Sequence, residues 1–236
     1  MRTIARCVSL LLGLLLFSAT RIPAFDVILD PREVNKMLAE IGTFFQESRS
    51  AKTERERLDS LYEMGERVLD LADLMTRDKD SHGAVDPSLA AVIQRRLSEY
   101  GVTLIADKLG YHYDLAAFKE YLRRAPNGER ASDARYVLIG FDEPGENIPR
   151  LEQSIRDKEQ FIRQYPKFPE MSLVKFLLAQ QHVRLARLYA AQKRQPAADR
   201  QKKLAQDLYR EIVRLYPKSE EAEAAADYLE QTGAKK

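Results

Sequence analysis

The chain has few of the residue types that build metal centres and thiol sites. It contains one cysteine, Cys7, no tryptophan and three histidines. A single cysteine cannot form a disulfide within the chain or a centre with several thiolate ligands. None of the histidines, which are His82, His112 and His182, stands at ligand spacing from a cysteine or a carboxylate. We therefore expect no metal and no cofactor.

Motifs of the common enzyme classes are also missing. The sequence has no glycine-rich phosphate-binding loop and no nucleophile elbow. Its acidic pairs, such as Asp142-Glu143 and Glu220-Glu221, are adjacent, so on a helix the two side chains point in different directions. They cannot form the acid/base pair that a glycosidase needs. These absences predict a protein that is not an enzyme.

Glycine and proline are scarce, with ten of each in 236 residues. No stretch of useful length alternates apolar and polar side chains as a half-buried strand does. The nearest one, 136–141, is more simply the end of a helix. Apolar residues instead recur at intervals of three and four, which is typical of helices with one buried face. We expect an all-α fold with about nine helices after the leader described next.

The N-terminus has the pattern of a secretory signal peptide. Arg2 and Arg6 precede a leucine-rich run at 10–17, and small residues follow. The apolar run is about half the ~20 residues that span a bilayer. We expect export to the periplasm with cleavage after Ala24; cleavage after Ala19, an uncleaved anchor and a cytoplasmic protein with a hydrophobic start are the alternatives. Cys7 precedes the apolar run and is not in a lipoprotein cleavage box.

Removal of residues 1–24 changes the charge balance. The whole chain has 38 basic and 36 acidic residues, a net charge of +2. The leader holds three arginines and no acid, so 35 basic and 36 acidic residues remain, a net charge of −1. Proteins that bind nucleic acid normally have a basic excess on one face. We therefore expect no nucleic-acid partner.

Three stretches of the second half align on a proline. Pro126, Pro166 and Pro217 follow the segments FKEYLRRA, EQFIRQY and YREIVRLY, and the prolines are 40 and 51 residues apart. The matching apolar positions, from five residues before each proline to twelve after it, are Tyr121, Phe161 and Ile212; Ala131, Met171 and Ala222; Ala134, Val174 and Ala225; and Leu138, Leu178 and Leu229. Self-similarity of this length is typical of stacked helical repeats.

The last copy, 204–231, is the clearest. Pro217 follows Tyr216 and ends one helix, because its ring clashes with the preceding turn and it has no N–H to donate. Ser219 can cap the next helix, in which Ala222 and Ala225 allow a close approach of two backbones. Each such hairpin is too small to bury its own apolar face. The hairpins are therefore expected to stack as a superhelical solenoid.

At these residues the chain resembles the tetratricopeptide (TPR) superfamily, in the form "aromatic–x–x–YP–x–S–x–x–A–x–x–A" found in bacterial envelope proteins. Within it, the BamD-like group of outer-membrane assembly proteins is the most similar that we can suggest. The resemblance covers residues 111–232 and is best at YPKSEEAEAAADYL. The middle copy differs, with Lys167-Phe168-Pro169 in place of the serine cap, and the first copy has Ala125-Pro126-Asn127-Gly128. The resemblance implies a non-enzymatic scaffold for protein–protein interaction in envelope or outer-membrane assembly.

Residues 25–110 predict three helices without a clear repeat. The first opens at Asp30-Pro31 and ends near Ser48, and the second runs over 52–76. A polar segment with glycine, 77–85, is expected to be a flexible loop. The third helix is expected over 86–109. These helices form either degenerate repeats, which we prefer, or a small separate bundle, so we divide the mature chain into 25–110 and 111–236.

The repeat region has two insertions. Asp114 can cap a helix over 115–124, with its partner over 131–139, and the segment 141–149 is expected to be a connecting loop or an acidic rim. A longer helix, 169–191, is followed by a predicted loop over 192–203. That loop is basic and contains Lys193, Arg194, Arg200, Lys202 and Lys203 against the single acid Asp199. It is either a solvated loop or a patch for lipid headgroups, polyanionic glycans or an acidic partner.

The sequence as a whole favours an exported scaffold. Its expected partner is another envelope protein or a peptide segment, and peripheral association with a membrane, including the outer membrane, is compatible with the basic loop. The alternative is a periplasmic ligand-binding or enzymatic protein that uses helical repeats as a frame.

Overall fold

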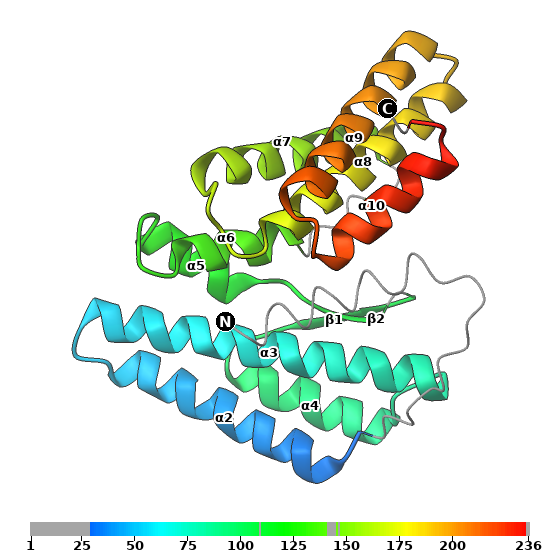
Figure 1. The fold of residues 1–236 in the computed structure, drawn as a ribbon. Helices are drawn as coiled ribbons and strands as arrows, with labels where there is room; N and C mark the ends of the chain where they lie inside the picture. Colours follow the sequence, from blue (N-terminus) through cyan, green and yellow to red (C-terminus); the bar gives the residue numbers. More distant parts are fainter. Residues whose placement is uncertain (1–28, 109, 141–144, 146, 235–236) are drawn as a thin grey trace. The chain divides into compact units, whose positions relative to one another are not determined.

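The computed structural model describes residues 29–108, 110–140, 145 and 147–234, and the predicted leader lies outside them. The described residues form nine helices and one two-stranded hairpin, which confirms the predicted all-α fold class (Figure 1). The chain divides into two compact units, residues 1–138 (unit 1) and 139–236 (unit 2). Each unit is described by itself.

Unit 1 begins with three capped helices, α2 (Pro31–Ser50), α3 (Glu54–His82) and α4 (Pro87–Glu99). The carboxylates of Asp30 and Asp86 each accept a backbone N–H from the first turn that follows, at 2.8 Å. Thr53 and Glu56 form a reciprocal capping box at the start of α3. Helix α2 packs antiparallel on α3 and also contacts α4 (Figure 1). The buried side chains between them include Leu38, Ile41, Val68, Leu71, Ile93 and Leu97.

Helix α3 continues through most of the segment that we predicted to be a loop, so that prediction is wrong. Its polar side chain Asp78 is 6% exposed and accepts a hydrogen bond from the backbone N–H of Leu29 at 3.0 Å. The helix ends only at Gly83, whose φ of 83° is left-handed and whose N–H donates to the carbonyl of Lys79. The buried carboxylate of Asp78 therefore fixes the backbone of Leu29, which precedes α2.

The helix predicted over 86–109 ends ten residues early, at Glu99. Gly101 has a φ of 71°, its N–H donates to the carbonyl of Ser98, and the N–H of Val102 donates to the carbonyl of Leu97. This pair of hydrogen bonds is the Schellman motif. Both Leu97 and Val102 are buried, so the motif has buried apolar residues at the two positions that its outer hydrogen bond joins. Gly101 therefore terminates α4.

The residues after this stop form an antiparallel hairpin, β1 (Leu104–Asp107) and β2 (Gly110–Tyr113). Strand β2 crosses the boundary that we placed at residues 110 and 111, and it packs on α3. The N–H of Tyr111 donates to Oγ1 of Thr76 at 2.8 Å, and the proton of that hydroxyl is shared between the carbonyls of Ala72 at 2.9 Å and Tyr111 at 3.3 Å. The hairpin is thus fixed by a side chain 35 residues earlier in the chain.

Helices α5 (Ala116–Arg124) and α6 (Ala131–Gly140) follow close to the predicted limits. The Asp114 carboxylate accepts the N–H of Ala116 at 3.0 Å, but the N-cap residue of α5 is Leu115, so Asp114 lies one residue before the capping position that we predicted for it. Helix α5 packs on α3 where Gly65 allows a close approach: a Cβ at Gly65 would lie 3.0 Å from the ring of Phe118.

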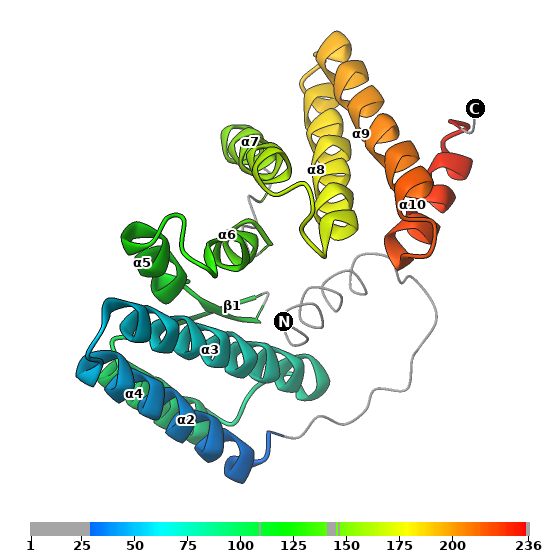
Figure 2. The ribbon, with the colours of Figure 1, turned by 60° about the vertical axis from the view of Figure 1, so that its left-hand side comes forward.

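Unit 2 contains α7 (Ile148–Gln164), α8 (Met171–Ala191), α9 (Gln195–Leu215) and α10 (Glu220–Gln231). Helix α8 packs against α7 and α9, and α10 packs against α9 (Figure 2). The apolar cluster that joins the first three helices comprises Leu151, Ile155, Leu178, Leu185, Tyr189 and Ala198. Most of the loop predicted over 141–149 lies outside the described residues, but its end is the first turn of α7, which Asn147 caps.

The basic segment 192–203 is mainly helical, which corrects the predicted loop. Only Gln192, Lys193 and Arg194 form a turn, in which Lys193 has a left-handed φ of 60°. Helix α9 begins at Gln195, and its residues Ala198 and Ala205 are both buried on the face that packs into unit 2. Ala198 and Ala205 stand at helical spacing and could have indicated this helix, but the high charge of the segment favoured the interpretation as a loop.

Candidate functional site

The three proline corners have the same backbone geometry. The residues before the prolines, Ala125, Tyr165 and Tyr216, have φ values of −129°, −128° and −128°, with ψ values of 69°, 56° and 48°. Each of these residues closes the helix that precedes it, with its N–H donating to the carbonyl four residues earlier at 2.8–2.9 Å. The prolines therefore occupy equivalent places between the helices that flank them.

Two further hydrogen bonds repeat at each corner. The residue two positions after the proline, Gly128, Phe168 or Ser219, donates its N–H to the carbonyl before the proline at 3.0, 3.0 and 2.9 Å. The carbonyl of that same residue then accepts the N–H three residues later, at 3.0, 3.2 and 3.1 Å. The turn is thus held by backbone groups, which explains why its side chains can vary.

The aligned positions also have matching burial. From five residues before the proline to five after it, the sequence of buried, half-buried and exposed residues is the same in all three copies. The aligned apolar side chains are buried except for one; they are Tyr121, Phe161, Ile212, Ala131, Met171, Ala222, Ala134, Val174, Ala225, Leu178 and Leu229, whereas Leu138 is half-buried. The repeat residues therefore pack the interior, and a binding site has to be sought among the exposed residues.

The basic residues predicted as a partner-binding patch are all exposed. Lys193 and Arg194 lie in the turn between α8 and α9, and Arg200, Lys202 and Lys203 lie on the first half of α9. None of the five forms an ion pair with another residue in the described part of the chain. Arg194 instead stacks on the ring of Tyr189, at 4.4 Å from its centroid.

Helix geometry divides the patch. Arg200 and Lys203 are three residues apart and share one face of α9, whereas Lys202 points in a different direction. The nearby acid Asp199 accepts a hydrogen bond from Gln195 at 2.8 Å, so it is engaged within its own helix. We name these five residues, Lys193, Arg194, Arg200, Lys202 and Lys203, the basic turn. Its cations are available to an anionic partner.

Unit 2 also holds buried polar contacts that the sequence did not reveal. The Ser154 hydroxyl accepts hydrogen bonds from Lys158 at 3.0 Å and from Gln181 at 2.9 Å. A serine bonded to a lysine is the atom pair of some nucleophilic sites. Here Ser154 is 1% exposed and Lys158 is 2% exposed, so a substrate cannot reach the hydroxyl without opening the interface of α7 and α8. The pair is therefore best explained as a structural contact.

A second buried contact joins α8 to α9. Nδ1 of His182 lies 2.6 Å from Oε1 of Gln201, and His182 is 3% exposed. Burial lowers the pKa of His182 below its usual value, and the contact with Gln201 opposes that shift. The imidazole is thus favoured in its neutral form and donates to the amide oxygen.

Unit 1 carries a titratable cluster around Arg130. The guanidinium group lies 2.6 Å from Glu63, 3.9 Å from Glu66 and 4.7 Å from the ring centroid of Tyr62. Burial, and then the charge of Glu63, raise the pKa of Glu66 to about 7. The cluster joins α3 to the segment before α6, and no regular motif in the sequence marks it.

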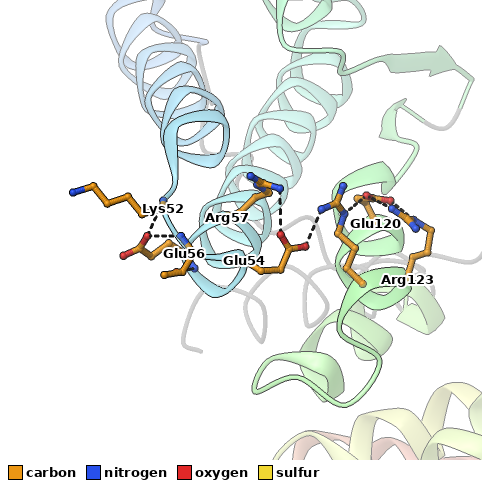
Figure 3. A network of polar contacts seen from close by, with 8 residues as sticks. Lys52, Glu54, Glu56, Arg57, Glu120 and Arg123 are labelled. Atoms are coloured by element: carbon orange, nitrogen blue, oxygen red, sulfur yellow. Dashed lines mark hydrogen bonds and ion pairs between the residues drawn. The ribbon is translucent and has the colours of Figure 1, made fainter.

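An exposed ion-pair network joins the start of α3 to α5 (Figure 3). Glu54 contacts Arg57 at 3.2 Å and Arg124 at 2.8 Å, and Glu120 contacts both Arg123 and Arg124. The hydrogen bonds from the two arginines lower the pKa of Glu120 to about 2. Exposed pairs of this kind contribute little to stability because water screens them. The network orients the side chains that lie between α3 and α5.

Two histidines lie beside a carboxylate. His82 lies 3.2 Å from Asp78, and His112 lies 3.0 Å from Asp107 across the hairpin. Within the part of the chain that the structure describes, no group of three or more histidine, cysteine or carboxylate side chains is placed to hold a metal ion. In the same residues, no helix has the length and apolar character needed to cross a membrane.

No protein-family model matches the sequence, and a search of curated proteins finds no match.

Proposed function

We propose that this protein is an exported, TPR-like scaffold that binds another protein and has no catalytic activity of its own. The observation that carries the proposal is the equivalence of the corners at Pro166 and Pro217 within unit 2. Helices α7 and α8 flank the first corner, α9 and α10 flank the second, and α8 packs on α9 between the two hairpins. Repeated hairpins that pack on their neighbours are the elements of solenoids, whose usual task is to hold a partner.

The chemistry of unit 2 supports binding more than catalysis. The polar groups with catalytic potential, Ser154 and His182, are buried and hydrogen-bonded to neighbouring helices. The cations of the basic turn are exposed and have no acidic partner among the described residues. Unpaired surface cations attract anionic partners over a distance of about one Debye length, roughly 8–10 Å. We therefore propose an acidic segment of another envelope protein as the ligand of this surface.

The cellular place of the scaffold follows from the predicted leader and from the resemblance to BamD-like proteins. Both support a periplasmic location and a role in the assembly of the envelope or outer membrane. N-terminal sequencing of the protein from its own host tests the first part. We expect the chain to begin at Phe25, and a chain that still begins at Met1 in the cytoplasm would contradict export.

Site-specific photocrosslinking in that host tests the binding function. A photoreactive residue at Lys203, on the basic turn, should trap a discrete protein, whereas one at Gln160, exposed on α7, serves as the matched position in the same unit. Charge reversal of Arg200 should reduce the crosslink from position 203 but leave the folded content of the protein unchanged. The proposal fails if exposed positions around unit 2 trap no protein.

A further inference from the structure

The β-hairpin of unit 1 has one covered edge and one open edge. On the covered edge, the backbone N–H and C=O of Tyr111 are both engaged by the hydroxyl of Thr76 on α3. These two groups therefore point away from β1. The open edge belongs to β1, which pairs only with β2 among the described residues.

The register shows which groups of β1 face the open edge. Tyr111 stands opposite Ala106 in the antiparallel pair. Opposed residues in such a pair alternate between those that bond to each other and those whose N–H and C=O point outward. The backbone N–H and C=O of Tyr111 point outward, away from β1. The backbone N–H and C=O of Ala106 therefore point outward on the other side of the hairpin, and so do those of Leu104, two residues earlier. The open edge thus presents two N–H groups and two C=O groups.

An apolar side chain lies in the middle of this edge. Ile105, between Leu104 and Ala106, is 53% exposed, which is more than the other large exposed hydrophobic residues, Val92, Leu204 and Leu215. Natural proteins block an open edge with proline, charged side chains, a bulge or a very short strand. Strand β1 is short, at four residues, but it contains no proline, no lysine and no bulge, and its one charged residue, Asp107, contacts His112 of β2.

We propose that β1 pairs antiparallel with β1 of a second copy of this chain, about a two-fold axis through Ile105. In this arrangement Leu104 of each copy stands opposite Ala106 of the other, so that all four outward groups of each edge find partners. The two Ile105 side chains then face each other across the axis and cover one another. Closed two-fold contacts of this self-complementary kind are the commonest in homo-oligomers.

The shape of the edge favours a second copy over a longer strand from another protein. The edge is bounded by the turn at Gly101 on one side and by the turn after Asp107 on the other. A strand longer than this would find no further backbone partners. In the symmetric pairing Asp107 falls opposite Thr103, so that no like charges stand directly opposite each other. The inference is independent of the proposed partner-binding function, because it uses unit 1 alone.

Disulfide trapping tests the pairing. In the full chain carrying Cys7→Ser, an Ile105→Cys variant would place two sulfurs across the axis in a pair without mutual hydrogen bonds. The Cα atoms of such a pair are about 4.5 Å apart, which is within the range that a disulfide requires. Under mild oxidation we expect about tenfold more covalent dimer than for the matched variant His112→Cys. Position 112 is exposed on the same hairpin, but in the pairing it lies about 14 Å from its copy, three strand spacings away.

Sedimentation of the chain without introduced cysteines gives a second readout. A contact this small should give a weak dimer, so the average mass should rise across the micromolar range for the unmodified chain. Ile105→Lys should stay monomeric, because it opposes two like charges at the axis while circular dichroism stays unchanged. Equal trapping at positions 105 and 112, a dimer that Ile105→Lys leaves intact, or a chain that stays monomeric would each overturn the proposal.

Discussion

The backbone N–H of Arg130 donates a hydrogen bond to the hydroxyl of Tyr121 at 3.1 Å, across the corner formed by Pro126. The same hydroxyl occupies the space above Gly128. A Cβ added at Gly128 would lie 2.7 Å from that oxygen and 2.9 Å from Cβ of Ala125. A larger residue is therefore excluded by a tyrosine seven residues earlier in the chain.

The other two corners explain why the glycine is confined to the first. Their residues at the position of Tyr121 are Phe161 and Ile212, which carry no hydroxyl group. Phe161 packs edge-on against Phe168, with ring centroids 5.1 Å apart, and Ser219 caps α10 instead. The residue two positions after the proline, which is Gly128, Phe168 or Ser219, thus varies with the side chain five positions before the proline. The backbone of the corner stays the same.

Gly128→Ala should lower the free energy of unfolding by about 1–3 kcal/mol, because the added methyl group overpacks the corner. Urea denaturation followed by circular dichroism measures the change. The matched test adds Tyr121→Phe, which removes the oxygen that the methyl group meets. The cost of Gly128→Ala should be smaller in that background, although the contact with Ala125 remains. An equal cost in both backgrounds would mean that the Tyr121 hydroxyl is not the obstacle.

Ala225→Leu should also destabilise the protein by about 1–3 kcal/mol, because Ala225 is fully buried in α10 and a larger side chain has to push the helix from its neighbours. Ala190→Leu on the exposed face of α8 is the matched control and should change stability by less than about 0.5 kcal/mol. Thermal unfolding of the two variants makes the comparison. Similar melting temperatures for both would contradict the burial of Ala225.

The features that were predictable from the sequence depend on local signals. The corners at Pro166 and Pro217 could be identified because proline ends a helix wherever it stands, and because Phe161 and Ile212 recur at a fixed offset. The starts of α2 and α4 were predictable for the same reason, since Asp30 and Asp86 act on the turns that follow them.

The features that were missed depend on residues far away in the sequence. Strand β1 was interpreted as the end of a helix because four-residue strands are too short to show alternation, and Thr76, which fixes the hairpin, lies on α3. The extension of α3 was missed because Asp78 looks like a loop residue until Leu29, 49 residues earlier, is placed beside it. The buried polar pair of His182 and Gln201 likewise has no signal along the chain.

The raised pKa of Glu66 predicts a pH dependence of stability. Its folded pKa is about 7, above the usual 4.5, because burial disfavours the carboxylate. Between those values the folded state holds a proton that the unfolded state has lost, so the free energy of unfolding falls as pH rises from about 4.5 to about 7. The shift corresponds to at most about 3 kcal/mol, and partial exposure of the side chain reduces it.

Glu66→Gln should remove this dependence, since glutamine has no proton to lose. The variant should therefore gain stability relative to the unmodified protein as pH rises from about 5 to about 7. Urea denaturation at a series of pH values measures the difference. Glu99→Gln, at an exposed position at the end of α4, is the control and should follow the unmodified protein. A constant difference between Glu66→Gln and the unmodified protein would contradict the raised pKa.

His182 in unit 2 should act in the opposite direction. Burial holds its pKa below the usual 6.5, so below that pH the unfolded state takes up a proton that the folded state does not. The free energy of unfolding should therefore fall as pH drops from about 6.5 through the folded pKa. His182→Gln should cost about 1 kcal/mol or more at neutral pH, because the contact with Gln201 is rearranged, but its stability should fall less on acidification. The variant and the unmodified protein could instead lose stability in parallel between neutral pH and about pH 5. In that case the assignment of a neutral imidazole to His182 is wrong, and a charged ring makes the contact with Gln201.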